Sequence, residues 1–117
     1  MSRSDRSNEK VLDHLISELN NIRGSRPEWQ KVCFDGLHDN GNPIYHTNVI
    51  MGITPSTVAL ATHTIPDPSE KRQVTTSLLD SGYSLMDLTP KQLEAFGGNI
   101  ITLYSPTKQQ ELVVASR

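Results

Sequence analysis

Residues 43–62 read PIYHTNVIMGITPSTVALAT and carry the clearest structural signals of the chain. Residues 49–53 and 57–62 are two β-prone runs, and the three residues between them, Thr54, Pro55 and Ser56, are typical of a hairpin connection. Upstream, residues 41–43 (Gly-Asn-Pro) predict a turn that delivers the chain to His46. The stretch therefore predicts a histidine presented just before an apolar strand.

Downstream of this hairpin the sequence predicts a helix and a third strand. Asp67 can cap the helix, Pro68 suits its first position, and Glu70 stands where a capping box needs an acidic partner. The expected buried stripe of this helix is Val74, Leu78 and Leu79. Gly82 suits the left-handed residue after the helix, and residues 84–88 return as a strand with Leu85 inward. Residues 49–88 are thus a β-β-α-β unit.

The flanking segments have clear patterns as well. Before the unit, an amphipathic helix capped by Ser7 or Asn8 ends before Gly24, and residues 31–34 are a short strand candidate. The apolar positions of that helix are Val11, Leu12, Leu15, Ile16 and Leu19. After the unit, Thr89 caps a shorter helix that ends near Phe96, and residues 100–104 and 112–115 form a second strand pair.

Composition limits the classes of function. The 117 residues are only 35% hydrophobic, which favours a thin core, and the net charge of -2 argues against nucleic-acid binding. The longest aliphatic run, residues 49–53, is too short to cross a membrane, and residues 1–10 lack the apolar region of a signal peptide. We therefore expect a soluble cytoplasmic protein with no membrane partner.

The single cysteine and the histidines exclude several kinds of site. Cys33 alone cannot form an internal disulfide, which fits a reducing compartment. His14, His38, His46 and His63 show no metal-ligand spacing. We expect no metal and no cofactor.

Residues 43–49, read with the Phe96, Gly97, Gly98 and Asn99 corner, resemble the histidine segment of the pentein superfamily of guanidino-group hydrolases and amidinotransferases. The resemblance covers residues 4–117 and is closest to citrulline-utilisation-type hydrolases, more distant to arginine deiminase. It implies a partial α/β propeller with about two β-β-α-β units of five. The whole chain, 1–117, is then one partial domain, divided into 1–48 (helix, strand and histidine-bearing turn), 49–88 (the unit) and 89–117 (short helix and strand pair).

The resemblance implies a Cys-His mechanism in which a thiolate attacks the guanidinium carbon. His46 is the one catalytic residue it assigns here, as general acid and then general base. An imidazole can do both because its unperturbed pKa lies near ~6.5. Asn48 stands where arginine deiminases have an aspartate, and Asn99 is a substrate-binding candidate. Without the family context, His46 could be a structural or merely exposed residue, and Asn99 a turn-forming one.

The nucleophile implied by the resemblance is missing from this chain. Cys33 lies between Val32 and Phe34 in a strand candidate, where a cysteine is usually a buried, unreactive hydrophobe. None of the carboxylates matches a guanidinium ligand of the family. The sequence therefore predicts a fragment of an enzyme acting on arginine- or citrulline-type substrates, inactive alone.

Two alternatives stay open at the level of sequence. The chain could be a noncatalytic interaction module, because a fold alone does not confer activity. It could also be a subunit that a partner chain completes. Exposed strand edges predict self-association in either case.

Overall fold

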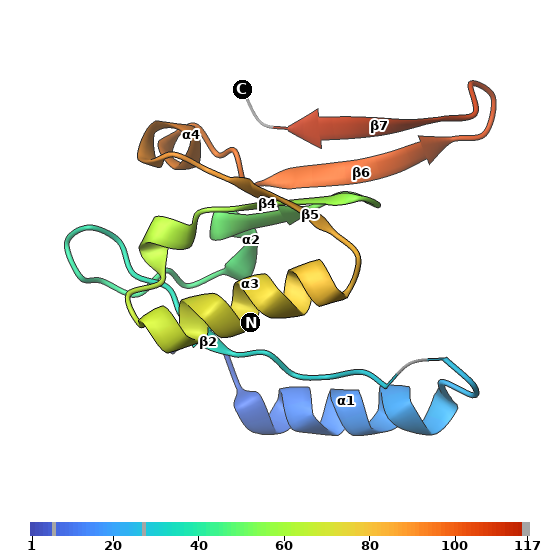
Figure 1. Ribbon diagram of the computed structural model, residues 1–117, viewed down its shortest axis with the longest axis horizontal. Helices are drawn as coiled ribbons and strands as arrows, with labels where there is room; N and C mark the ends of the chain where they lie inside the picture. The colour runs from blue at the N-terminus through green and yellow to red at the C-terminus, as the bar shows by residue number, and fades with distance from the viewer. Residues whose placement is uncertain (6, 27, 116–117) are drawn as a thin grey trace.

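The computed structural model describes residues 1–5, 7–26 and 28–115 of this α/β chain. A three-stranded sheet lies at the centre, with one helix against it, a second helix at one end of the molecule and a β-hairpin at the other (Figure 1). In chain order the elements are β1 (Ser2–Arg3), α1 (Glu9–Ile22), β2 (Phe34–Asp35), α2 (Thr47–Ile50), β3 (Met51–Ile53), β4 (Thr57–Leu60), the 3-10 helix η1 (Thr62–Thr64), α3 (Pro68–Asp80), β5 (Ser84–Asp87), α4 (Pro90–Glu94), β6 (Ile100–Ser105) and β7 (Gln110–Ala115).

The central sheet has the strand order β3-β4-β5 and confirms the predicted β-β-α-β unit. β3 runs antiparallel to β4 with Gly52 opposite Ala59, and β5 runs parallel to β4. The backbone N–H of Thr54 donates to the carbonyl of Thr57 at 2.9 Å, which closes the hairpin where the sequence predicted it. The helix α3 makes the crossover between the two parallel strands.

The ends of α3 follow the sequence signals with one difference. The carboxylate of Asp67 accepts from the backbone N–H groups of Ser69 and Glu70, and Gly82 has a φ of +87° after the helix. The side chain of Glu70, however, binds elsewhere instead of completing a capping box. The complete capping box is at α4, where Thr89 and Gln92 bond each other reciprocally.

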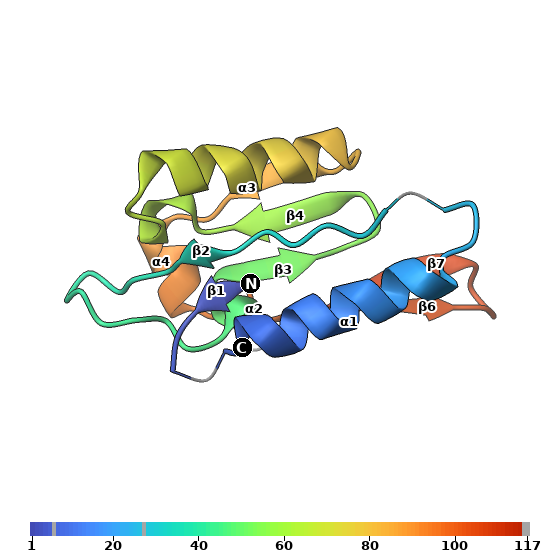
Figure 2. The same cartoon turned by 90° about the horizontal axis from the view of Figure 1, so that it is seen from below.

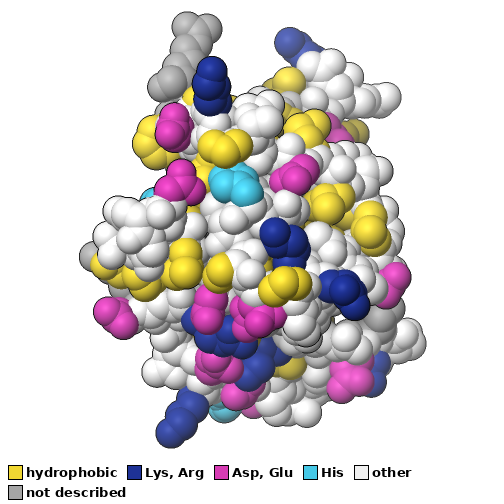
Figure 3. Space-filling view, turned by 60° about the vertical axis from the view of Figure 1, so that its left-hand side comes forward, with side chains coloured by type: hydrophobic (Ala, Val, Ile, Leu, Met, Phe, Trp, Pro, Cys, Tyr) yellow, Lys and Arg dark blue, Asp and Glu magenta, His cyan; other side chains and the backbone are white. Residues whose placement is uncertain are grey.

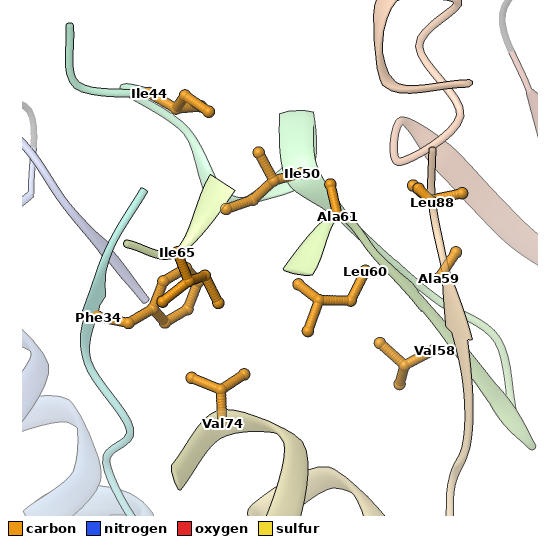
Figure 4. Packing of buried hydrophobic residues seen from close by; sticks show 10 residues of the cluster. All are labelled: Phe34, Ile44, Ile50, Val58, Ala59, Leu60, Ala61, Ile65, Val74 and Leu88. Carbon is orange, nitrogen blue, oxygen red and sulfur yellow. The ribbon is translucent and has the colours of Figure 1, made fainter. Parts of the chain in front are cut away.

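The buried core is confined to the central unit and the segments beside it. Figure 4 shows Val58 and Leu60 on the side of Val74, and Leu88 beyond Ala59 and Ala61. The full cluster is Phe34, Ile44, Ile50, Val58, Ala59, Leu60, Ala61, Ile65, Val74 and Leu88. Neither α1 nor the β6–β7 hairpin contributes to it. All buried residues of this cluster therefore lie between residues 34 and 88, in agreement with the thin core that the composition predicted.

Several expected boundaries and orientations were wrong. The run 49–53 is not one strand, because α2 takes up residues as far as Ile50 before β3 begins. The strand expected at 31–34 is limited to β2 and pairs in parallel with β1, which the sequence did not predict. Leu78 packs on the core as expected, but Leu79 is exposed. It lies five positions after Val74, off the i, i+4 stripe of the helix.

The helix α1 forms where predicted but buries none of its residues. Asn8, one of the two candidate caps, accepts from the backbone N–H groups of Lys10 and Val11. An extended segment then leads back from α1 to β2 and runs between α1 and α3 (Figure 2). None of the helices that the structure describes is both long and apolar enough to cross a membrane.

A network of ion pairs joins the N-terminal segment to α1, β2 and α3. The guanidinium of Arg3 donates to the carboxylates of Glu9, Asp35 and Glu70, and Glu70 also accepts from the backbone N–H of Asp35 at 2.8 Å. Figure 3 shows Lys and Arg side chains intermixed with Asp and Glu side chains at the lower end of the molecule. These charges join the chain's first residues to α3, and Met1 also lines a hollow together with Val74 and Leu78 of that helix.

The 96–99 corner packs closely on the backbone that follows His46. A Cβ added to Gly98 would lie 2.6 Å from the carbonyl oxygen of Val49 and 3.0 Å from the backbone nitrogen of Met51. A Cβ on Gly52 would meet the side chain of Ile100 in the same way. Glycine is required at both positions because the neighbouring chain occupies the space of a side chain.

Replacing Glu70 by glutamine is expected to lower the free energy of unfolding by about 1 kcal/mol at neutral pH, since it removes the charge from a partly exposed ion pair. The Arg3 guanidinium, aided by the backbone N–H of Asp35, holds the pKa of Glu70 below its ordinary value. Because the folded pKa is the lower one, the stabilisation is present above the unfolded pKa of about 4.3 and is lost as the pH falls through the folded value.

Urea unfolding of the wild type and Glu70→Gln at several pH values measures this effect. The stability difference should be largest near neutrality and shrink below about pH 4. Glu94→Gln, at the exposed end of α4, is the matched control and should change little. If the difference in stability between the wild type and Glu70→Gln did not change with pH, the charge of Glu70 would not be the cause of the stabilisation.

Replacing Gly98 by alanine is expected to destabilise the chain by about 1–3 kcal/mol, because the added methyl group would overlap backbone atoms that cannot rotate away. Thermal and urea unfolding measure the loss. Asn99→Ala, at the adjacent exposed position, adds no atoms and is the control. An alanine at position 98 that left stability unchanged would mean that the corner does not pack against residues 49–51.

Candidate functional site

His46 lies at the N-terminal cap position of α2, at the end of the turn predicted from sequence. The N–H of His38 donates to the carbonyl of Asn42 at 2.9 Å, and Gly41 has a φ of +80°. Leu37 and Pro43 then pair as an isolated antiparallel bridge. The His46 side chain is exposed and makes no capping hydrogen bond. The backbone of His46 is thus fixed at the surface, while no capping hydrogen bond fixes its imidazole ring to the helix.

The residues on either side of His46 anchor the segment. The N–H of Ile44 donates to the carbonyl of Gly36 at 2.7 Å, and Ile44 is fully buried. The hydroxyl of Thr47 accepts from the backbone N–H of Ser2 at 2.9 Å. The hydroxyl of Ser4 donates to the carbonyl of Tyr45 at 3.1 Å. Hydrogen bonds to Gly36, Ser2 and Ser4 therefore fix the loop from which His46 projects.

Asn48 and Asn99 are both exposed, on segments that the structure brings together. Asn48 lies in α2, and Asn99 directly follows Gly98, which packs on the backbone of Val49 and Met51. The N–H of Asn99 donates to the carbonyl of Phe96 at 2.9 Å. Phe96 has a φ of +59°, so the left-handed residue of this turn is the phenylalanine and not Asn99. The two motifs that suggested the family are therefore neighbours in space.

A groove of about 490 Å³ lies between α1 and the 45–48 segment. His46 and Asn48 line it on one side, and Val11, Leu12 and Leu15 of α1 line it on the other. Its surface is mainly apolar at the α1 side and polar at the histidine side, which suits a ligand with a polar head and an aliphatic body. Asn99 does not line this groove.

The contribution of α1 to this groove was not predicted. The sequence showed the amphipathic pattern of this helix but did not indicate what its apolar residues contact. In the structure Val11 and Leu15 are at least half exposed and face the groove. The helical periodicity of the apolar residues was visible in the sequence. Only the tertiary structure shows that these residues face the 45–48 segment.

A second hollow, of about 530 Å³, lies over the turn on the other side of Tyr45. It is lined by polar residues of the loop such as His38, Asp39 and Asn42, and His46 does not reach it. Because its walls come from one exposed loop, it offers little burial to a ligand. The groove beside α1 is the better candidate.

Cys33 is buried as the sequence predicted, and it does not line the groove that contains His46. It lies close to the N-terminal amino group, which donates to the carbonyl of Val32, and burial is the main cause that lowers the pKa of that amino group. The guanidinium of Arg3 binds carboxylates and not the thiol of Cys33.

Four carboxylates near these segments have structural partners. Asp35 and Glu70 bind Arg3, and Asp67 caps α3. Asp87 accepts from the backbone N–H and the hydroxyl of Thr62. Within residues 1–5, 7–26 and 28–115, no three histidine, cysteine, aspartate or glutamate side chains meet as a metal site requires.

Comparison with known proteins adds one finding. The family model described as N,N dimethylarginine dimethylhydrolase, eukaryotic, matches residues 1–117. No curated protein and no solved structure matches the chain. A match over the whole chain shows the family, and that family is part of the superfamily that residues 43–49 and 96–99 indicated. The chain therefore belongs to the eukaryotic N,N-dimethylarginine dimethylhydrolase family of the pentein superfamily.

Proposed function

We propose that this chain supplies the acid/base part of a hydrolase that acts on the guanidino group of methylated arginine or a related arginine- or citrulline-type compound. The observation that carries the proposal is the groove in which His46 and Asn48 face the apolar side of α1. The family match gives the reaction class. The groove gives a surface for a charged or polar head beside an aliphatic chain.

His46 acts first as general acid and then as general base. A thiolate attacks the guanidinium carbon, the C–S bond forms, and the C–N bond to the leaving amine breaks as His46 protonates that amine. His46 then takes a proton from water, which attacks the same carbon and releases the ureido product and the thiolate. The exposed ring of His46, free of a capping bond, is able to turn between these two positions.

Asn48 and Asn99 bind the polar parts of the substrate. Each amide has both donor and acceptor atoms, so each can bond a guanidino or an amino-acid group. Asn48 shares the groove with His46. Asn99 lies outside the groove, on the corner that packs against residues 49–51, and its part in binding rests on the family resemblance. Val11, Leu12 and Leu15 contact the aliphatic or N-methyl groups.

The thiolate comes from outside the described residues. Cys33 is buried and does not line the groove, so it does not attack a ligand bound beside His46. The chain supplies about two of the five β-β-α-β units of a pentein propeller, and further polypeptide supplies the cysteine and the carboxylates that hold the guanidinium. Alone, the chain binds without turning over, and its single unpaired cysteine fits a cytoplasmic location.

A second candidate function is a noncatalytic interaction module. The uncovered apolar residues of α1 and of the β6–β7 hairpin support it, because exposed apolar patches commonly mark protein contacts. It differs from the first proposal in a simple way: it needs neither the imidazole of His46 nor a small guanidino ligand.

Two measurements on the 117-residue protein separate these functions. Titration with dimethylarginine, followed by amide chemical shifts, should perturb residues 45–48 and the 11–15 side of α1. Mixing with a family member that retains its cysteine but lacks its own catalytic histidine should give ureido product, whereas the chain alone should give none. Absence of both signals favours the interaction module.

In the mixed assay His46→Ala is expected to lower the rate by about 10²–10⁴-fold, the usual contribution of a general acid-base residue. His63→Ala, which removes a histidine from η1, is the matched control and should leave the rate unchanged. A mixed rate that survives His46→Ala would show that the imidazole is not the acid-base group.

A further inference from the structure

His46 stands at a junction where the backbone changes from extended to helical. Its φ and ψ are -131° and 130°, and α2 begins at the next residue, Thr47. The backbone N–H of Val49 donates to the carbonyl of His46 at 3.1 Å, and this hydrogen bond closes the first turn of α2. Because φ and ψ are the soft dihedrals of a residue, a change in the ψ of His46 would alter the direction of its side chain relative to α2.

The helix α2 is too short to hold this junction by itself. It has four residues, and the first turn of a helix is unfavourable because several dihedrals are fixed for one hydrogen bond. Helices commonly begin with a serine, threonine, aspartate or asparagine whose side chain accepts from the backbone. His46 occupies that position without such a bond. The junction is therefore held by residues other than His46.

Ser2 is bonded to the chain on both sides of His46. Its backbone N–H donates to the hydroxyl of Thr47 at 2.9 Å. Its own hydroxyl donates to the carbonyl of Ile44 at 3.3 Å. Of these two bonds, the one to Thr47 lies on the helical side of the junction, directly after the ψ dihedral of His46.

Ser2 is itself anchored to the core. It is buried, and it pairs with Phe34 in the parallel β1–β2 ladder. Phe34 belongs to the buried core cluster. The hydroxyl of Ser2 also packs closely on Gly36, where an added Cβ would lie 2.9 Å from the hydroxyl oxygen. β1 lies between β2 and α2 (Figure 2), so the bond from Ser2 connects Thr47 to the core.

We propose that Thr47 is a positioning residue for His46: its hydroxyl, bonded to the backbone of Ser2, fixes the junction from which the imidazole is presented to the groove. The inference rests on the proposed function, because positioning affects a rate only where His46 transfers protons. An acid-base group works within hydrogen-bond distance of the atom that it protonates, and a misplacement of about 1 Å can lower a rate about 10²-fold. The ring stays free to turn about its side-chain bonds, while Thr47 fixes where those bonds start.

Thr47 also lines the groove, so a direct contact between its hydroxyl and the substrate is the alternative role. The two roles differ in their kinetic effect. Loss of a positioning residue lowers kcat and leaves KM nearly unchanged, whereas loss of a binding residue raises KM. The bond from Ser2 favours the positioning role, because the hydroxyl of Thr47 already accepts from the backbone there.

Three variants test the inference. Thr47→Val keeps the shape of the side chain and removes the acceptor. Thr47→Ser keeps the hydroxyl and loses only a methyl group. Thr62→Val is the matched control, because it removes a hydroxyl bond to Asp87 outside the groove. Urea unfolding of all three shows how far the loss of a hydroxyl bond lowers stability in general.

Amide hydrogen exchange and NMR on the 117-residue chain measure the junction without any enzymatic activity. The amide of Val49 is expected to exchange about 2–10-fold faster in Thr47→Val, the usual effect of one hydrogen bond on an equilibrium. The signals of the His46 ring should shift in the same variant. Thr47→Ser and Thr62→Val should resemble the wild type in both. Unchanged exchange at Val49 in Thr47→Val would overturn the inference.

The assay with a family member that retains its cysteine measures the catalytic consequence. Thr47→Val is expected to lower kcat about 10–100-fold with KM within about twofold, and Thr47→Ser should restore most of the rate. Thr62→Val should leave kcat unchanged. If Thr47→Val raised KM alone, or left kcat as it was, the positioning role would be wrong.

Failure of the proposed function gives a different result from failure of this inference. If the wild-type mixture formed no product, the proposed function would fail, and the measurements on the chain alone would decide whether Thr47 orients His46. Faster exchange at Val49 together with shifted ring signals in Thr47→Val would support that role. Either of these left unchanged would overturn it.

Discussion

Burial of β4 on both faces is the constraint on which the rest of the structure depends. Val58, Ala59, Leu60 and Ala61 are each less than 9% exposed, although the chain as a whole is poor in apolar residues. On one side they meet α3, and on the other they lie near Leu88 and the turn that follows α4 (Figure 4). A strand buried on both faces fixes the register of its neighbours, because a slip by one residue would exchange the two sets of side chains.

The loop that carries His46 takes its position from this strand. The N–H of Ala61 donates to the carbonyl of Ile50 at 2.9 Å, so the end of α2 is bonded to the end of β4. On the other side of the same segment, Gly98 packs on Val49 and Met51. His46 and Asn48 are thus exposed side chains on a backbone held by a buried strand and a glycine corner, an arrangement in which a rigid frame carries reactive groups at its surface.

Away from β4 the chain depends on charges and hydrogen bonds. α1 buries no residue, and Arg3 and Lys31 connect its acidic side chains to the rest of the molecule. Such partly exposed ion pairs contribute little each, so the ends of the molecule are held less firmly than its centre. The same lack of apolar cover leaves Val11 and Leu15 of α1 and Ile101 and Leu103 of the β6–β7 hairpin exposed.

Elements with strong local signals could be predicted from the sequence. Prolines and caps at Asp67 and Thr89 predicted α3 and α4, and β-prone runs around turn residues predicted both hairpins. The residues around His46 indicated the superfamily that the family match then showed. Local chemistry decides these features because each depends on a few adjacent residues. The propeller arrangement and the roles of His46, Asn48 and Asn99 stay predictions.

The contacts of the apolar residues of α1 became apparent only from the tertiary structure. The periodicity of α1 predicted an amphipathic helix, and its Val11 and Leu15 border the groove. Val49 and Ile50, predicted as the start of a strand, lie in the helical turn α2. The parallel pairing of β1 with β2, and the meeting of Gly98 with Val49, join residues far apart in sequence. No local pattern encodes such contacts, because they depend on the path of the whole chain and on which surfaces remain after the core has formed.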